Sequence, residues 1–179
     1  MKGKILLIIS IILITGLPVF AYQSLQQIFL AADGQGSYDK YIELDPDIEY
    51  LGDLRITGGL DVYLDGNGAY IYAQNSSMIQ IGVNGSKLDI QECVLIGGIC
   101  GIYSVNGGSG TYKNNTITGC TDAGIKVLNP IIADSHIYDN IITECTDGFY
   151  CVEYEHPQYL GYNTIYNMSR YRYAEFCPS

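Results

Sequence analysis

Short runs of alternating apolar and polar residues recur along most of the chain, separated by Gly, Asn, Asp, Ser and Thr. Alternation with a period of two is typical of β-strands, because successive side chains of a strand point to opposite faces. No run of this kind is long enough for a helix. The pattern therefore predicts an all-β protein made of many short strands.

The strands belong to a unit that repeats. Each copy begins with Asn-x-Ile or a related triplet and continues six or seven residues later with Gly and an apolar residue. The copies start at Ala69, Glu92, Asn115, Asn140 and Asn163. Successive starts are 23, 23, 25 and 23 residues apart. A period of this length marks a solenoid, in which each copy forms one coil and stacks on the next.

Stacking of the copies would place equivalent side chains about 4.8 Å apart along the interior. One interior column is expected to hold Ile71, Val94, Ile117, Ile142 and Ile165, and a second to hold Ile79, Ile102, Ile125, Phe149 and Tyr173. A third strand aligns Tyr112, Ile137 and Leu160, with Leu88 or Ile90 as the preceding member. The sequence thus predicts a parallel β-solenoid of about five coils.

The first residues of the copies form a polar column. Three of them in succession are Asn115, Asn140 and Asn163, which indicates a ladder of side-chain amides, each bonded to the next. Such a ladder satisfies polar groups at a bend and fixes the register of the coils. We assign these residues a structural role.

The repeat resembles that of the right-handed parallel β-helix proteins of the pectate lyase-like superfamily, over roughly residues 60–176. The resemblance implies a right-handed β-helix. It does not imply one reaction, because this superfamily includes lyases, hydrolases, epimerases, phage tailspikes and adhesins.

The chain divides into three parts. Residues 1–21 read as a secretory signal peptide, with Lys2 and Lys4 before an apolar run, and so predict a secreted or cell-surface protein. Residues 22–59 are expected to hold lead-in strands at 41–44 and 53–57 and a short capping helix at 24–32, begun by Ser24, that covers one end of the solenoid. Residues 60–179 hold the repeats.

Charge limits the partners. The formal net charge is −10, and loss of Lys2 and Lys4 with the signal peptide makes it −12. Such a chain repels nucleic acid and anionic membranes, and an anionic polysaccharide unless a cation bridges the two. We therefore expect no nucleic-acid partner, no membrane partner after signal cleavage, and a polysaccharide or cell-surface glycan as the possible ligand.

Asp122 and Asp147 are the candidate catalytic residues. A Thr-Asp pair occurs near the Gly in two adjacent copies, so the two carboxylates are expected to stack on the outside of the coil. There they could bind Ca²⁺ or act as the acid and nucleophile of a retaining glycosidase, or simply cap their own turns. We expect no cofactor other than this possible Ca²⁺.

The resemblance also raises the proton-abstracting Arg of pectate lyases, for which Arg55, Arg170 and Arg172 are the candidates. The sequence motifs of polygalacturonases are absent. The favoured hypothesis is therefore a non-catalytic module for glycan contact or surface scaffolding. The alternatives are a polysaccharide lyase or glycoside hydrolase, and a fragment of a larger adhesin-like protein.

Tyrosine is abundant, with 17 residues and no Trp. Those that alternate with the interior columns should face outward, where aromatic rings can stack on the apolar faces of sugars. The candidates for carbohydrate binding are Tyr103, Tyr138, Tyr150 and Tyr166. We assign His136 and His156 to loops without a catalytic partner.

The six cysteines suggest disulfides in an exported chain. Cys120 and Cys145 occupy the same position in adjacent copies, but stacked side chains point in parallel, so we favour reduced thiols there. Cys151 and Cys177 could pair if the final loop shifts. The chain stops soon after the last copy, which predicts either a longer reading frame or end-to-end contact at an uncapped C-terminal coil.

Overall fold

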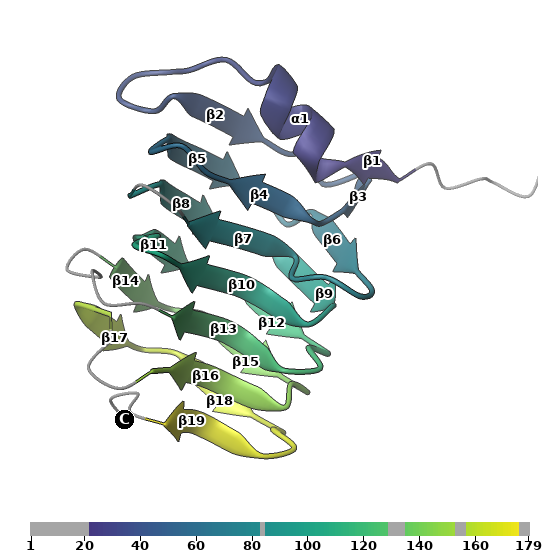
Figure 1. The fold of residues 1–179 in the computed structure, drawn as a ribbon. Helices are drawn as coiled ribbons and strands as arrows, with labels where there is room; N and C mark the ends of the chain where they lie inside the picture. Colours follow the sequence, from purple (N-terminus) through teal and green to yellow (C-terminus); the bar gives the residue numbers. More distant parts are fainter. Residues whose placement is uncertain (1–21, 83–84, 129–134, 153–156, 176–179) are drawn as a thin grey trace, which may run out of the picture.

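The computed structural model describes residues 22–82, 85–128, 135–152 and 157–175. The predicted signal peptide, His156 and Cys177 lie outside these residues. The described chain winds into a stack of coils, each of which contributes one strand to each of three parallel sheets (Figure 1). This is the expected all-β parallel solenoid.

We name the sheets in the order in which each coil visits them, counting the first coil from β2. Sheet A contains β2 (Lys40–Glu43), β5 (Asp61–Asp65), β8 (Lys87–Gln91), β11 (Gly110–Lys113), β14 (Ser135–Tyr138) and β17 (Tyr159–Gly161). Sheet B contains β1 (Gln23–Ser24), β3 (Glu49–Leu51), β6 (Tyr70–Ala73), β9 (Val94–Gly97), β12 (Thr116–Thr118), β15 (Ile141–Thr143) and β18 (Thr164–Tyr166). Sheet C contains β4 (Leu54–Ile56), β7 (Ile79–Gly82), β10 (Cys100–Val105), β13 (Ala123–Leu128), β16 (Asp147–Cys151) and β19 (Tyr171–Glu175).

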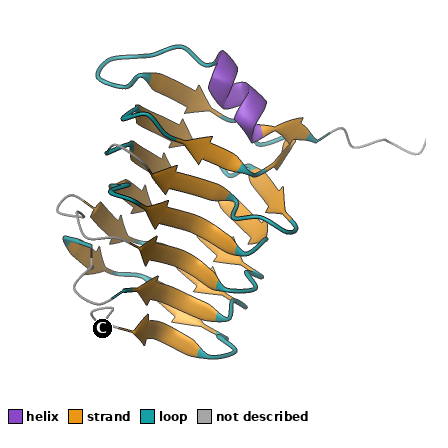
Figure 2. Ribbon diagram, viewed as in Figure 1, coloured by secondary structure: helices purple, strands orange, loops and turns teal. Residues whose placement is uncertain are grey.

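The structure has about six coils, one more than the repeat predicts. The extra coil is made of β2, β3 and β4, because the lead-in strands pair in parallel with the first recognised copy. Helix α1 (Leu25–Ala31) covers the end of this coil (Figure 2). Its residues Leu25 and Phe29 are buried. The hydroxyl of Ser24 accepts a hydrogen bond from the Gln27 N–H at 3.4 Å, as an N-cap does.

The interior column of sheet C is the predicted one from Ile79 to Tyr173. The predicted column of sheet B was wrong at one position, because Leu95 and not Val94 aligns with Ile71 and Ile117. The turn before β9 holds one more residue than the alignment assumed, so Cys93 replaces Glu92 beside the asparagine ladder. In sheet A the aligned residue is Ile90, which settles the choice that the sequence left open.

Glycines at one repeated position explain the spacing of the motif. A Cβ atom on Gly101, Gly124 or Gly148 would lie 2.5, 2.4 or 2.5 Å from the Cγ2 atom of an isoleucine in the next coil. Those isoleucines are Ile117, Ile142 and Ile165. The Gly of one copy therefore makes room for the Ile of the following copy. This close contact between coils explains why the Asn-x-Ile…Gly pattern pairs a Gly with an Ile.

The amide ladder lies at the turn from sheet A to sheet B. Asn115 Nδ2 donates to Asn140 Oδ1 at 3.1 Å, and Asn140 Nδ2 donates to Asn163 Oδ1 at 2.9 Å. The same Oδ1 atoms also accept the backbone N–H groups of Asn115 and Asn140, each at 3.0 Å. The ladder thereby fixes successive coils in register at the corner between the two sheets.

Candidate functional site

The outer face of sheet A carries two rows of side chains that cross the coils. One row runs through Tyr41, Tyr63, Asp89, Thr111, His136 and Tyr159. The other runs through Glu43, Asp65, Gln91, Lys113 and Tyr138. The strands of this sheet alternate buried and half-exposed residues, so the same pattern that fills the core also builds this polar and aromatic surface.

Three tyrosines gather near the α1 end of this face. The rings of Tyr41 and Tyr63 stack with centroids 4.8 Å apart, and the ring of Tyr38, from the loop after α1, lies 5.3 Å from that of Tyr63. The Tyr38 hydroxyl donates to Asp89 Oδ2 at 2.7 Å, and this bond together with burial raises the pKa of Tyr38 to about 12. Burial and the nearby Asp65 raise the pKa of Tyr63 to about 12 as well.

Two adjoining cavities open on this face. The first, of about 220 Å³, lies beside Tyr38 and Tyr63 over β8 and β11. The second, of about 640 Å³, is lined by His136, Tyr159 and Tyr162 among others. Tyr138 lines both. The two cavities therefore adjoin at Tyr138, and we refer to them together as the sheet A cleft, whose lining residues come from several coils.

Two carboxylates at the first cavity are already hydrogen-bonded within the protein. Asp89 accepts from the Tyr38 hydroxyl and, at 2.8 Å, from the Thr111 N–H. Asp65, at the rim, accepts from Gln91 Nε2 at 2.7 Å. Among the described residues that line the two cavities, Lys113 is the one lysine or arginine. The cleft thus combines tyrosine rings with a few polar groups that the fold holds in place.

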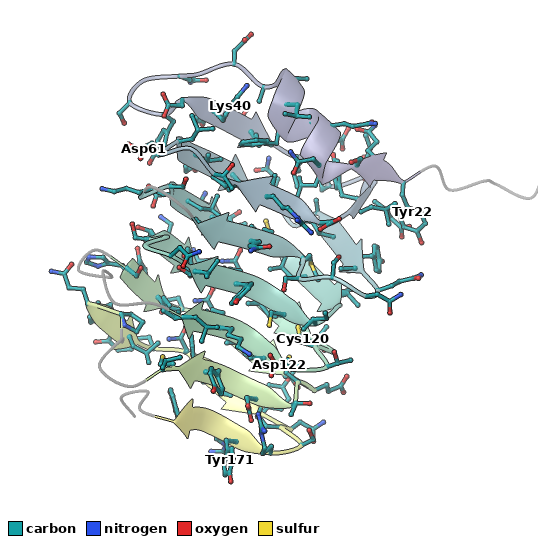
Figure 3. The ribbon with its side chains drawn as sticks, viewed as in Figure 1. Tyr22, Lys40, Asp61, Cys120, Asp122 and Tyr171 are labelled. Atoms are coloured by element: carbon teal, nitrogen blue, oxygen red, sulfur yellow. The ribbon has the colours of Figure 1, made fainter. Side chains whose placement is uncertain are left out.

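The expectation that Asp122 and Asp147 stack on the outside was wrong. Asp147 aligns with Ala123, because the turn of its copy is one residue shorter and the Thr-Asp pair shifts by one position. Asp147 is fully buried, whereas Asp122 is half-buried on the turn beside Cys120 (Figure 3). The two carboxylates consequently face different surroundings.

Each of these aspartates has a cationic partner. Asp122 Oδ2 lies 2.6 Å from Lys126 Nζ. Arg170 makes a bidentate ion pair with Asp147: its Nε donates to Oδ1 at 2.9 Å and its Nη2 donates to Oδ2. Asp147 also accepts a hydrogen bond from the Tyr171 N–H. The hydrogen bonds that Arg170 donates to the Asp147 carboxylate raise the pKa of Arg170. Arg170 therefore links the last two coils and is not positioned as a free base.

The remaining candidate residues do not come together in one site. Arg55 lies on sheet C, 3.6 Å from Asp53, and Arg172 is exposed in β19. In the described part of the chain, no three His, Cys, Asp or Glu side chains come together in a group that could hold a metal ion. Calcium binding by Asp122 or Asp147 stays a prediction.

The four predicted tyrosines do not form one site. Tyr103 and Tyr150 flank Lys126 on the outside of sheet C, and the Lys126 ammonium lies 4.6 Å from the Tyr150 ring centroid. Tyr166 is exposed on sheet B. Tyr138 alone lies in the cleft. The cleft tyrosines that we missed in the first coils could have been found, because Tyr-x-Glu and Tyr-x-Asp recur at Tyr41 and Tyr63 with the period of one coil.

The cysteines are structural in the described residues. Cys93, Cys100, Cys120 and Cys145 are free and buried, so the expected reduced pair at Cys120 and Cys145 is present. Burial raises the pKa of Cys100 to about 11, which keeps its thiol protonated at neutral pH. Cys151 is disulfide-bonded, and Cys177, its predicted partner, lies outside the described residues.

Comparison with known families shows which family the chain resembles. Residues 67–175, more than half of the chain, match the family described as a right handed beta helix region. Neither the curated proteins nor the solved structures contain a match to this sequence. Among the described residues, no helix has the length and apolar character needed to cross a membrane.

Proposed function

The chain belongs to the right-handed β-helix family, and we propose that it is an exported, non-catalytic member that binds a glycan chain in the sheet A cleft. One observation carries the proposal: two adjoining cavities share Tyr138 and are flanked by tyrosines from several coils. A site of this kind suits an extended ligand that crosses the coils.

The chemistry of the cleft supports a sugar ligand. Sugar rings have an apolar face that packs on an aromatic ring and hydroxyl groups that need hydrogen-bond partners. The cleft offers Tyr63, Tyr138 and Tyr159 for the first requirement, and the side chains of Gln91, Thr111 and Gln158 lie among them for the second. This mixture of aromatic walls and a few polar groups is usual in ligand sites.

Charge favours an uncharged glycan. Glu43, Asp61, Asp65 and Asp89 all project from the part of sheet A nearest α1, whereas the cavities contain one lysine, Lys113. A uronic-acid or sulfated chain would place its own charges against these carboxylates. We therefore assign the cleft to a neutral glycan, with Lys113 as a hydrogen-bond donor to hydroxyl oxygens.

The carboxylate of the first cavity supports binding and not hydrolysis. Glycosidases place two carboxyl groups on either side of the scissile bond, about 5 to 9.5 Å apart. In the first cavity the lining carboxylate is Asp89, and both of its oxygens accept hydrogen bonds from within the protein. The second cavity contributes Asp139, which belongs to the turn after β14.

The test is a binding measurement on the purified protein expressed from its full reading frame. Calorimetry with soluble neutral polysaccharides should give an affinity that Tyr138→Ala lowers at least 10-fold. The reason is that the Tyr138 ring no longer packs on a sugar ring in either cavity. Tyr103→Ala is the matched control, since Tyr103 is also an outward strand tyrosine but lies on sheet C. It should bind like the parent.

The same protein samples show whether the protein only binds a glycan or also cleaves it. Reducing ends and unsaturated products are followed with neutral and uronic-acid polysaccharides, in Ca²⁺ and in chelator. Turnover of any substrate would overturn the non-catalytic assignment. Equal loss of binding in the Tyr138 and Tyr103 variants would remove the cleft from consideration.

A further inference from the structure

The outer face of sheet B differs from the rest of the surface because it has almost no charge. One row across the coils contains Glu49, Tyr70, Val94, Thr116, Ile141 and Thr164. A second row lies two residues further along the same strands and contains Leu51, Tyr72, Ile96, Thr118, Thr143 and Tyr166. Glu49 is the one charged residue in the two rows, although the whole chain has a net charge of −10.

This face also exposes large apolar side chains. Leu51, Tyr70, Ile141 and Tyr166 are 46, 45, 43 and 48% exposed, and they are spread from the first coil to the last. Tyr22, 46% exposed, packs beside the face on Tyr72 with ring centroids 5.7 Å apart. A continuous uncharged face of this kind on an otherwise acidic protein marks an interaction surface.

We propose that a second copy of this chain covers sheet B, face to face, to form a symmetric dimer. The size of the face fits such a partner. Seven strands at about 4.8 Å spacing make it about 29 Å long, and three half-exposed tyrosines alone present roughly 300 Å². With the other side chains of the two rows, the face approaches the roughly 800 Å² that each partner contributes to a standard interface.

Charge and periodicity single out a second copy. Two chains of net charge −10 repel one another, and sheet B is the face on which they can meet with the fewest carboxylates in contact. The partner's sheet has the same spacing between coils, so side chains can interdigitate along the full length. Both surfaces are rigid sheets, which keeps the entropic cost of ordering small.

The side chains also select an orientation. If the two coil axes run in opposite directions, the first coil of one copy lies against the last coil of the other. Glu49 then faces Thr164, and the large Tyr70 faces the smaller Ile141. If the axes ran in the same direction, each coil would face its equivalent, with Glu49 against Leu51. The opposed arrangement avoids that burial of a charge against an apolar side chain.

The rim of the face agrees with this orientation. Asp53 follows β3 in the first coil, and its side chain is 59% exposed. Arg170 follows β18 in the last coil on the same side of sheet B, and its side chain is 48% exposed. Opposed axes bring Asp53 of one copy toward Arg170 of the second copy, at both ends of the dimer.

The test is the mass of the purified full-length protein in solution. Sedimentation equilibrium from 1 to 100 µM should show a dimer. Ile96→Glu and Thr118→Glu, each in the centre of the face, should shift it to monomer. Gln80→Glu, at an outward position of sheet C, is the matched control and should stay dimeric. Thermal unfolding of each variant shows whether the fold persists.

Cysteine cross-linking tests the orientation without a destabilising charge. With oxidised glutathione as the electron acceptor, Tyr70→Cys combined with Ile141→Cys should give a covalent dimer on non-reducing gels. Tyr70→Cys combined with Thr164→Cys should not, because those positions do not face each other in opposed coils. A protein that is monomeric at every concentration overturns the proposal, and so does a dimer that both Glu variants leave intact. The proposal would also be overturned by a monomer that co-sediments with an insoluble polysaccharide and loses this binding in Ile96→Glu. That result would mean that sheet B binds a solid glycan and not a second copy.

Discussion

Sheet A and sheet B are made by the same coils, yet their outer faces have little in common. Sheet A is acidic near α1, hollowed by two cavities and lined with tyrosines that hydrogen-bond to carboxylates. Sheet B presents threonine, isoleucine, valine and tyrosine with Glu49 as its one charge. Asp61, at the start of β5, and Tyr22, next to β1, lie on opposite sides of the coil stack (Figure 3).

The inward positions of the two sheets are nevertheless alike. Ile90 and Ile137 in sheet A and Leu95 and Ile142 in sheet B are all fully buried aliphatic residues. Because side chains alternate along each strand, the outward residues can change without altering the core. A β-helix can therefore support a different surface on each sheet, and the proposed glycan cleft and the proposed dimer face need not interfere with each other.

The largest effect is expected where the two sheets meet. Asn140→Ala removes a buried amide that donates to Asn163 and to the Tyr112 carbonyl and accepts from Asn115. The groups left without partners should lower the free energy of unfolding by about 3 to 5 kcal/mol. Chemical denaturation measures this. Because the corner serves both sheets, glycan binding and dimerisation should weaken together as the folded fraction falls.

Asn163→Ala is the matched control for this experiment. Asn163 is at the end of the ladder and is only half-buried, so its loss should cost less than the loss of Asn140. Equal losses of unfolding free energy at the two positions would mean that the ladder does not depend mainly on Asn140, the buried residue with hydrogen bonds to both neighbours.

The next largest effect separates the two faces. Tyr138→Ala should lower the affinity for a neutral glycan at least 10-fold and leave the dimer intact, because the Tyr138 side chain lies in the cleft. Ile96→Glu should dissociate the dimer and leave the glycan affinity of each subunit within about twofold. Calorimetry and sedimentation on both variants make the comparison. A variant that changes both readouts without unfolding would show that the faces are coupled.

Alkaline pH should affect the cleft through its tyrosines. The pKa values of Tyr38 and Tyr63 are raised to about 12, so the folded state favours their neutral phenols. Their contribution to stability is then complete below pH about 10, the ordinary tyrosine value, and is lost as the pH rises through about 12. Absorbance at 295 nm should show a late-titrating fraction that Tyr38→Phe reduces. A single transition near pH 10 in both proteins would contradict this.

The fold could be predicted from the sequence because the repeated apolar positions are the residues that fill the interior of the solenoid. The second column from Ile79 to Tyr173 was confirmed, since an apolar or aromatic residue recurs there every 23 or 24 residues. The sheet B column was wrong at Val94 because a turn can lengthen by one residue without changing the composition of the strand that follows. In a period-two pattern that single residue exchanges the inward and outward side chains.

The site was harder to predict because, apart from Tyr41 and Tyr63 in the first two coils, its outward residues change from coil to coil. Asp122 and Asp147 looked equivalent in sequence, yet one shortened turn buries Asp147 and leaves Asp122 half-buried at the surface. The cleft depends on Tyr38, which comes from the loop after α1 and reaches Asp89 across 51 residues of sequence. Contacts of that range depend on the three-dimensional path of the loop, and the repeat does not contain that information.

The smallest effect is the response to salt, and it separates the two faces because only the dimer should respond. A neutral glycan carries no charge for the cleft to attract or repel, so its affinity should stay within about twofold between 0.05 and 0.5 M NaCl. The dimer joins two chains of net charge −10 through an uncharged face, so screening of their repulsion should strengthen it a few-fold over the same range. Sedimentation and calorimetry at the two salt concentrations give both numbers. A dimer weakened by salt would mean that ion pairs and not the apolar rows of sheet B hold the copies together, and a glycan affinity that falls with salt would mean that the ligand is charged.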